Sequence, residues 1–125
     1  MRVERWDPAV HASLLAAWVG LASTDELDLS YLPPTGVVVD RMVAGFLYLT
    51  DSCVAYFDNF ISDPSSTGES RSAAMDVMVS ELLLAAKAAG AKVVVFCTAR
   101  PGLVARTARM GFQPESGYTF MKKEL

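Results

Sequence analysis

Residues 60–90 hold the pattern that most constrains the fold of this chain. A strand ends at Phe60, Ile61 and Ser62, a loop of mainly small polar residues follows over 63–71, and an apolar helical pattern then continues to Gly90. A helix that begins directly after such a loop has free backbone N–H groups at its N-terminus, where anions bind. The pattern therefore predicts a site for a phosphate-bearing ligand.

The other elements follow from periodicity and turns. Apolar residues at helical spacing predict helices, and β-branched or aromatic runs between tight turns predict strands. The predicted order is strand 1–6, helix 7–22, a short helical turn that opens at 23–26 and stops before Pro33, strands 36–39, 42–50 and 53–62, helix 66–89, strand 92–97, helix 101–110 and a final strand or hairpin over 112–125. The three central strands form an antiparallel meander, and the long helix, which Ser66 and Glu69 are predicted to open as a capping box, makes a parallel crossover. The fold class is α/β (α+β) with a mixed central sheet, in one domain over 1–125.

Charge is distributed unevenly along the chain. The net charge is −3, but residues 1–70 carry ten acids and three bases, and residues 71–125 carry four acids and eight bases. The basic half suits an anionic ligand and the acidic half a cationic one, although chance scatter of surface charge gives the same numbers. The chain has no general attraction for nucleic acid, and a weaker alternative places such a contact on the basic half.

Cysteine, histidine and hydropathy patterns exclude several classes. Cys53 and Cys97 lie in apolar runs and are expected to be buried free thiols rather than a disulfide. Two cysteines with the single His11, which is expected at the surface, predict no metal site. The N-terminus has no apolar signal region and no run reaches membrane-spanning length, so we expect a cytoplasmic protein without a membrane partner.

The order of elements resembles the GNAT acetyltransferase superfamily over nearly the whole chain. The sharpest similarities are the helix end and strand at 85–95 and the segment 105–112, which closes with Gly111 and Phe112. The chain also looks like small virus-type GNAT-like proteins. The resemblance implies helices on both faces of the sheet and a parallel strand pair that is splayed at the cofactor site.

That resemblance further implies a site for acetyl-CoA (coenzyme A). The backbone of Phe60, Ile61 and Ser62 would pair with the pantetheine arm, and the loop Ser66 to Ala74 would bind the pyrophosphate through its backbone N–H groups. The individually named cofactor-binding residues of this loop are Ser70, Arg71, Ser72, Ala73 and Ala74. Arg100, from a second strand-to-helix loop, is a candidate contact for the pantetheine or phosphate; the alternative is a solvated loop arginine. The family's phosphate loop carries glycines that this chain lacks, since the nearest one, Gly68, comes earlier.

The catalytic residues are less clearly marked. Thr107 stands where many family members have a tyrosine that protonates the leaving thiolate, and a threonine hydroxyl is a poor acid. Tyr48 and Tyr118 are substitutes without support from position. Asp58, beside aromatic residues, is the candidate base; the alternatives are an exposed carboxylate without a role and proton loss through water.

The resemblance implies an N-acetyltransferase that moves the acetyl group of acetyl-CoA to an amine by direct attack in a ternary complex. The acceptor would be a small-molecule or peptide amine. The competing hypothesis is a catalytically inactive GNAT-like binding or structural module. A homodimer is also considered, through pairing of the final strand at Tyr118 and Phe120.

Overall fold

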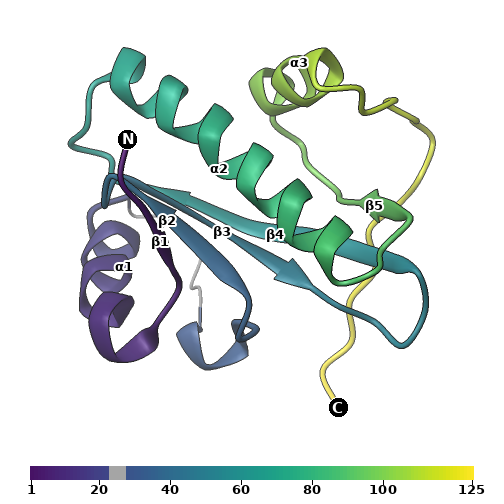
Figure 1. The fold of residues 1–125 in the computed structure, drawn as a ribbon, viewed down its shortest axis with the longest axis horizontal. Coiled ribbons are helices and arrows are strands. Elements are labelled where there is room, and N and C mark those ends of the chain that lie inside the picture. Colours follow the sequence, from purple (N-terminus) through teal and green to yellow (C-terminus); the bar gives the residue numbers. More distant parts are fainter. Residues whose placement is uncertain (23–27) are drawn as a thin grey trace. The chain divides into compact units, whose positions relative to one another are not determined.

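The computed structural model describes residues 1–22 and 28–125, and the chain divides into two compact units, Met1–Val95 and Phe96–Leu125. The first unit contains a five-stranded sheet in the order β1-β2-β3-β4-β5 (Figure 1). Its strands are β1 (Val3–Arg5), β2 (Gly36–Val39), β3 (Val43–Tyr48), β4 (Val54–Ser62) and β5 (Val93–Val95). Pairs from β1 to β4 are antiparallel and β4 pairs with β5 in parallel, which confirms the mixed sheet and the meander.

Local chemistry explains the tight turn between β2 and β3. Asp40 and Arg41 have φ values of 51° and 48°, both left-handed. Two consecutive left-handed residues match the right-handed twist of the paired strands, which is why such turns join hairpins. The element that precedes β2 is a 3-10 helix, η1 (Leu29–Tyr31). The helical turn predicted to open at 23–26 and to stop before Pro33 begins outside the described residues, and η1 lies in the part of it that the structure describes.

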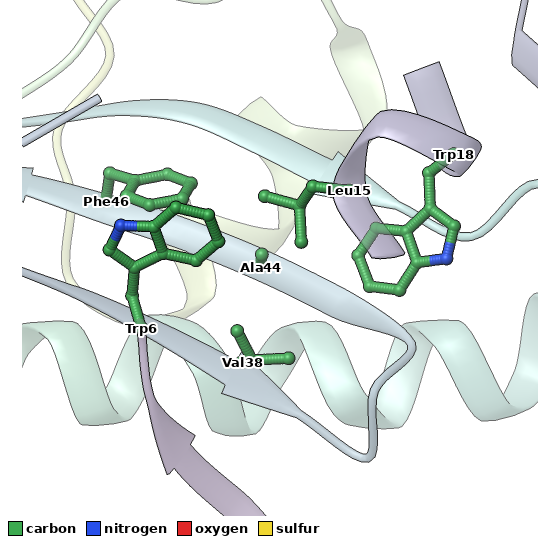
Figure 2. Close-up of a cluster of buried hydrophobic side chains, with 6 residues drawn as sticks. All are labelled: Trp6, Leu15, Trp18, Val38, Ala44 and Phe46. Atoms are coloured by element: carbon green, nitrogen blue, oxygen red, sulfur yellow. The ribbon is translucent and has the colours of Figure 1, made fainter. Parts of the chain in front are cut away.

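Helix α1 (Pro8–Ala22) covers one face of the sheet. Figure 2 shows Leu15 and Trp18 of this helix beside the strand side chains Val38, Ala44 and Phe46. These residues are buried and Trp6 joins them, meeting Phe46 edge to face at a ring distance of 5.2 Å. The apolar spacing of the helix therefore produces the first half of the core.

The single histidine is part of this layer, so its predicted surface position is wrong. His11 is 2% exposed and stacks on Trp6. Its Nδ1 accepts a hydrogen bond from the Asp7 N–H (3.0 Å), which leaves the hydrogen on Nε2, 3.1 Å from a Glu4 carboxylate oxygen. Glu4 also accepts two bonds from Arg41, at 3.1 and 3.3 Å. Burial of His11 is tolerated because both ring nitrogens have partners.

Helix α2 (Gly68–Ala88) covers the opposite face (Figure 1). Its buried side chains are Ala74, Met78, Val79, Leu82 and Ala86. Gly45 on β3 lets the helix approach, because a Cβ there would meet the Sδ of Met78 and lie 3.0 Å from Leu82 Cδ1. Just beyond the helix, Gly90 has φ 91°, the left-handed conformation that ends helices. Helices on both faces and the stop at Gly90 are as predicted.

The second unit contains α3 (Pro101–Arg109), which begins at a proline as predicted. Phe96 and Phe112 pack edge to face within this unit, with ring centroids 5.2 Å apart. The predicted final strand is wrong, because residues 112–125 form neither strand nor helix. Pro114 lacks an N–H for pairing and Gly117 has φ 91°, so each interrupts a ladder.

Both cysteines, Cys53 and Cys97, are free, as predicted, but both are exposed rather than buried. Cys53 lies in the turn that precedes β4, outside the apolar run of the strand. Among the described residues, none of the helices has the length and apolar character needed to cross a bilayer.

Candidate functional site

Strand β4 continues beyond its parallel neighbour. The last pair between β4 and β5 is Tyr56 with Val95, where β5 ends, whereas β4 runs on through residues 57–62. The Asp63 N–H donates to the Met42 carbonyl on the β3 side (2.8 Å). Backbone groups of successive strand residues point to opposite sides, so those of Ser62 face the edge that β5 has left. The strand pair is therefore splayed, as the resemblance implies.

The three residues predicted to line this edge do not all share it. Ile61, one residue before Ser62, directs its backbone to β3 by the same alternation and packs its side chain against the core under α1. Phe60 lies on the other face, where its Cδ1 would be 3.0 Å from a Cβ at Gly45. By the same alternation, the backbone groups of Ser62, and those of Phe60 two residues before it, point to the open edge, whereas those of Ile61 point to β3.

A β-bulge lies where β4 leaves β5. Ala44 pairs with Ile61 and Phe46 pairs with Asp58, so two residues of β4 stand opposite Gly45. The extra residue bends the strand and increases its twist, which turns its end away from its neighbours. Asn59, at the bulge, has φ 56° and its side-chain amide donates to the Tyr48 hydroxyl at 2.6 Å. Nothing in the alternating sequence pattern marks this bulge.

The turn from β4 into α2 is built by side-chain hydrogen bonds. Asp63 Oδ1 accepts bonds from the N–H and the hydroxyl of Ser65, at 2.9 and 2.7 Å. The Ser66 hydroxyl donates to the Asp63 carbonyl at 2.6 Å, so Ser66 belongs to the turn. Thr67 is the N-cap instead, and its hydroxyl accepts the N–H of Ser70 at 3.3 Å. The predicted capping box of Ser66 is therefore wrong by one residue.

This cap decides which amides are free for an anion. The Arg71 N–H donates to the Thr67 carbonyl at 2.9 Å, and Ser70 is held by the cap. Among the described residues, the N–H groups of 67–69 have no protein acceptor. The free amides thus lie within the loop Ser66 to Ala74 that is predicted to bind the pyrophosphate, ahead of the individually named residues 70–74, and Gly68 is the first helical residue. A Cβ at Gly68 would meet nothing within 4 Å, so this helix end is open.

The remaining predicted binding residues lie in different settings. Ser70 and Ala73 are exposed on the first turns of α2, Arg71 and Ser72 are half-buried, and Ala74 is fully buried in the core. A buried Ala74 side chain cannot reach a ligand. Arg100 belongs to the second unit, where it is the N-cap of α3 without a side-chain capping bond. Contacts of these residues with a cofactor stay a prediction.

Two of the candidate acid–base residues lie together at the bulge. Asp58 is exposed, and its Oδ1 accepts the N–H of Asn59 at 2.8 Å. Burial, with a smaller contribution from the charge of Asp58, raises the pKa of Tyr48. The raised pKa makes the Tyr48 hydroxyl a weaker proton donor, so a role for Tyr48 as the acid stays a prediction.

Thr107 and Tyr118 are placed differently. The Thr107 hydroxyl donates to the Leu103 carbonyl of its own helix at 2.8 Å, so its hydrogen is engaged. The Tyr118 side chain is exposed and its hydroxyl donates to Glu115 at 3.2 Å.

Comparison with solved structures shows what this arrangement resembles. Glucosamine-6-phosphate N-acetyltransferase from Arabidopsis thaliana matches with a TM-score of 0.69 and 8% identity, covering 98% of both chains. A Trypanosoma brucei acetyltransferase matches with a TM-score of 0.68 and 11% identity, covering 98% of this chain and 99% of its own. The chain has a GNAT-like fold.

A third similar structure contains a relevant ligand. A Mycobacterium tuberculosis protein solved in complex with CoA matches with a TM-score of 0.74 and 18% identity, over 97% of this chain and 76% of its own. No family model and no curated protein matches the sequence. The similarity to these structures lies in the arrangement of the backbone. At such low sequence identity it shows the GNAT-like fold alone.

Proposed function

We propose that this GNAT-like protein is an N-acyltransferase that takes its acyl group, acetyl in the simplest case, from acyl-CoA and transfers it to an amine. One observation carries the proposal: the open edge of β4 at Ser62 leads within five residues to three free amides at 67–69. Two acetyltransferases among the similar structures, together with a similar protein solved in complex with CoA, support the same choice of cofactor.

The residues at this edge fit the parts of CoA. The Ser62 N–H and C=O offer a strand-like hydrogen-bonding partner for the amides of the pantetheine arm. The amides of 67–69, at the positive end of the α2 dipole, suit a diphosphate, and Arg71 can add a charge. Bound acyl-CoA would supply an activated thioester, so that a C–N bond to the amine forms as the C–S bond breaks. Asp58 is the candidate to accept the proton that the amine loses.

The competing hypothesis of an inactive GNAT-like binding module makes a different prediction about turnover. The Thr107 hydroxyl stands where the family has its acid, and it is engaged by the Leu103 carbonyl. A module of this kind would bind CoA without transferring the acyl group, so binding and turnover have to be measured separately.

The first experiment measures stabilisation by acetyl-CoA in a wild-type protein and two charge variants. A ligand at 100 times its Kd adds about 2.7 kcal/mol to the unfolding free energy. Gly68→Glu puts a carboxylate at the first turn of α2, where it favours the helix dipole but repels a phosphate. Ser80→Glu adds the same charge at an exposed position three turns further along the helix.

We expect acetyl-CoA to stabilise the wild type and Ser80→Glu equally and Gly68→Glu little or not at all. Without ligand, Gly68→Glu should be at least as stable as the wild type. Equal stabilisation of all three proteins would place the phosphate elsewhere, and no stabilisation of any of them would rule out the CoA site. Release of free CoA with a panel of amines then separates an enzyme from a binding module.

A further inference from the structure

The face of the sheet covered by α1 carries a second group of polar residues at the bulge. Phe46 lies in the core under α1, and its cross-strand partner is Asp58. Tyr48, which packs against the same core, is the partner of Tyr56. Cross-strand partners project from the same face of a sheet, so Tyr48, Tyr56 and Asp58 share the α1 face. With Asn59 they form what we call the tyrosine–aspartate patch.

The patch is open to solvent and carries an uncompensated negative charge. Tyr56 is 48% exposed and Asp58 is exposed as well. Among the described residues no basic side chain pairs with Asp58, whereas Glu4 is held by Arg2, Arg41 and His11. The carboxylate of Asp58 is close enough to Tyr48 to raise the pKa of that hydroxyl, in addition to the larger effect of burial.

Asn59 fixes the orientation of the tyrosine in this patch. Its amide donates to the Tyr48 hydroxyl oxygen at 2.6 Å, so the hydroxyl keeps its own hydrogen for another acceptor. The left-handed φ of Asn59 at the bulge directs its side chain to this bond. The patch thus offers one carboxylate, one oriented hydroxyl and the rings of two tyrosines.

These groups match the chemistry of a protonated amine. A carboxylate forms strong charge-assisted hydrogen bonds with an ammonium group, and tyrosine rings attract cations to their faces. We propose that the tyrosine–aspartate patch is the acceptor site and that it selects amines that arrive as cations, with Asp58 as the counter-charge. This inference rests on the proposed acyl transfer, and it places the acceptor two residues beyond the last pair between β4 and β5.

Binding of a simple diamine tests the proposal without CoA. Wild-type protein labelled with ¹⁵N is titrated with 1,4-diaminobutane and, separately, with 1,4-butanediol, which has the same length and no charge. The amide signals of Asn59 report directly, because its N–H donates to Asp58 and its side chain to Tyr48. We expect saturable shifts at these signals with the diamine and none with the diol.

Paired variants identify the groups that bind. Asp58→Asn should weaken diamine binding by about tenfold or more, as expected for loss of a charged hydrogen bond. Asp51→Asn removes the same charge from an exposed turn of the same unit and should leave binding unchanged. Tyr56→Phe keeps the ring and should bind like the wild type, whereas Tyr56→Leu should bind about threefold more weakly.

Three results would overturn the proposal: no saturable shift at Asn59 with the diamine, equal shifts with the diol, or undiminished binding in Asp58→Asn. Because CoA is absent, these results do not depend on the stabilisation experiment. Diamine binding without CoA stabilisation would remove the transferase proposal and keep a cation site. CoA stabilisation without diamine binding would remove the acceptor site and keep the cofactor site.

Discussion

Substituting Gly45 by alanine tests how closely α2 must approach the sheet. A Cβ at this position would meet the Sδ of Met78 and lie 3.0 Å from both Leu82 Cδ1 and Phe60 Cδ1. Met78 and Leu82 are completely buried, so the helix residues have little room to move away. Extra methyl groups in closed cores cost about 1–3 kcal/mol, and replacing a strand glycine by alanine returns about 0.5–1 kcal/mol. We expect Gly45→Ala to lower the unfolding free energy by about 1–2 kcal/mol.

Urea unfolding followed by tryptophan fluorescence measures this change, because both Trp6 and Trp18 are buried in the first unit. Gly20→Ala is the matched control, since a Cβ there meets nothing within 4 Å and alanine stabilises a helix by about 0.5–1 kcal/mol. If the clash is with Met78, the double variant Gly45→Ala/Met78→Ala should lose less than the sum of the single losses. An unchanged or raised stability of Gly45→Ala, or strict additivity in the double variant, would refute the steric reasoning.

Three further predictions concern charge, capping and the bulge. Hydrogen bonds from Arg41 and His11 lower the pKa of Glu4 from 4.5 to about 2. The contribution of Glu4 to stability is therefore complete above pH 4.5 and is lost as the pH falls towards 2. In Glu4→Gln, the unfolding free energy measured in urea should depend less on pH over that window. Thr67→Ala should lower the unfolding free energy by about 1 kcal/mol and Thr67→Ser by much less; equal losses would argue against the cap. Both Asn59→Gly and Asn59→Ala remove the hydrogen bond to Tyr48, but alanine adopts the left-handed φ of this position less readily than glycine. Asn59→Ala should therefore be less stable than Asn59→Gly by about 1 kcal/mol in the same assay. Equal stability of the two variants would argue against backbone strain at this position.

Much of the fold was predictable because it depends on local patterns. The β-branched and aromatic strands of the meander, the turn at Asp40 and Arg41 and the stop of α2 at Gly90 each carry their signal in adjacent residues. The cap of α2 was missed by one residue, since Ser66 and Thr67 can both accept an N–H. Only the hydrogen bond from Ser66 to the Asp63 carbonyl decides between them.

The burial of His11 was missed although a sequence signal exists. His11, Leu15 and Trp18 are spaced i, i+4 and i+7, which places them on one face of α1, and all three are buried. The sequence does not show the two hydrogen-bonding partners that the ring nitrogens of His11 need when the ring is buried. Glu4 comes from strand β1 rather than from the helix of His11, and Arg41, which donates to Glu4, is 37 residues from it along the chain.

The β-bulge at Asn59 was also invisible in the sequence, and it connects the two halves of the proposed site. One extra residue opposite Gly45 bends the end of β4, next to the edge at Ser62 that is proposed to bind the cofactor. The same residue holds Tyr48 on the α1 face, next to Asp58. A transferase must bring cofactor and acceptor to one point while admitting them from different directions. In the proposed site, strand β4 presents its backbone edge to the cofactor and its side chains to the acceptor. Asn59→Gly should therefore weaken diamine binding more than it weakens stabilisation by acetyl-CoA. A larger loss of acetyl-CoA stabilisation than of diamine binding would show that the bulge does not support the acceptor site.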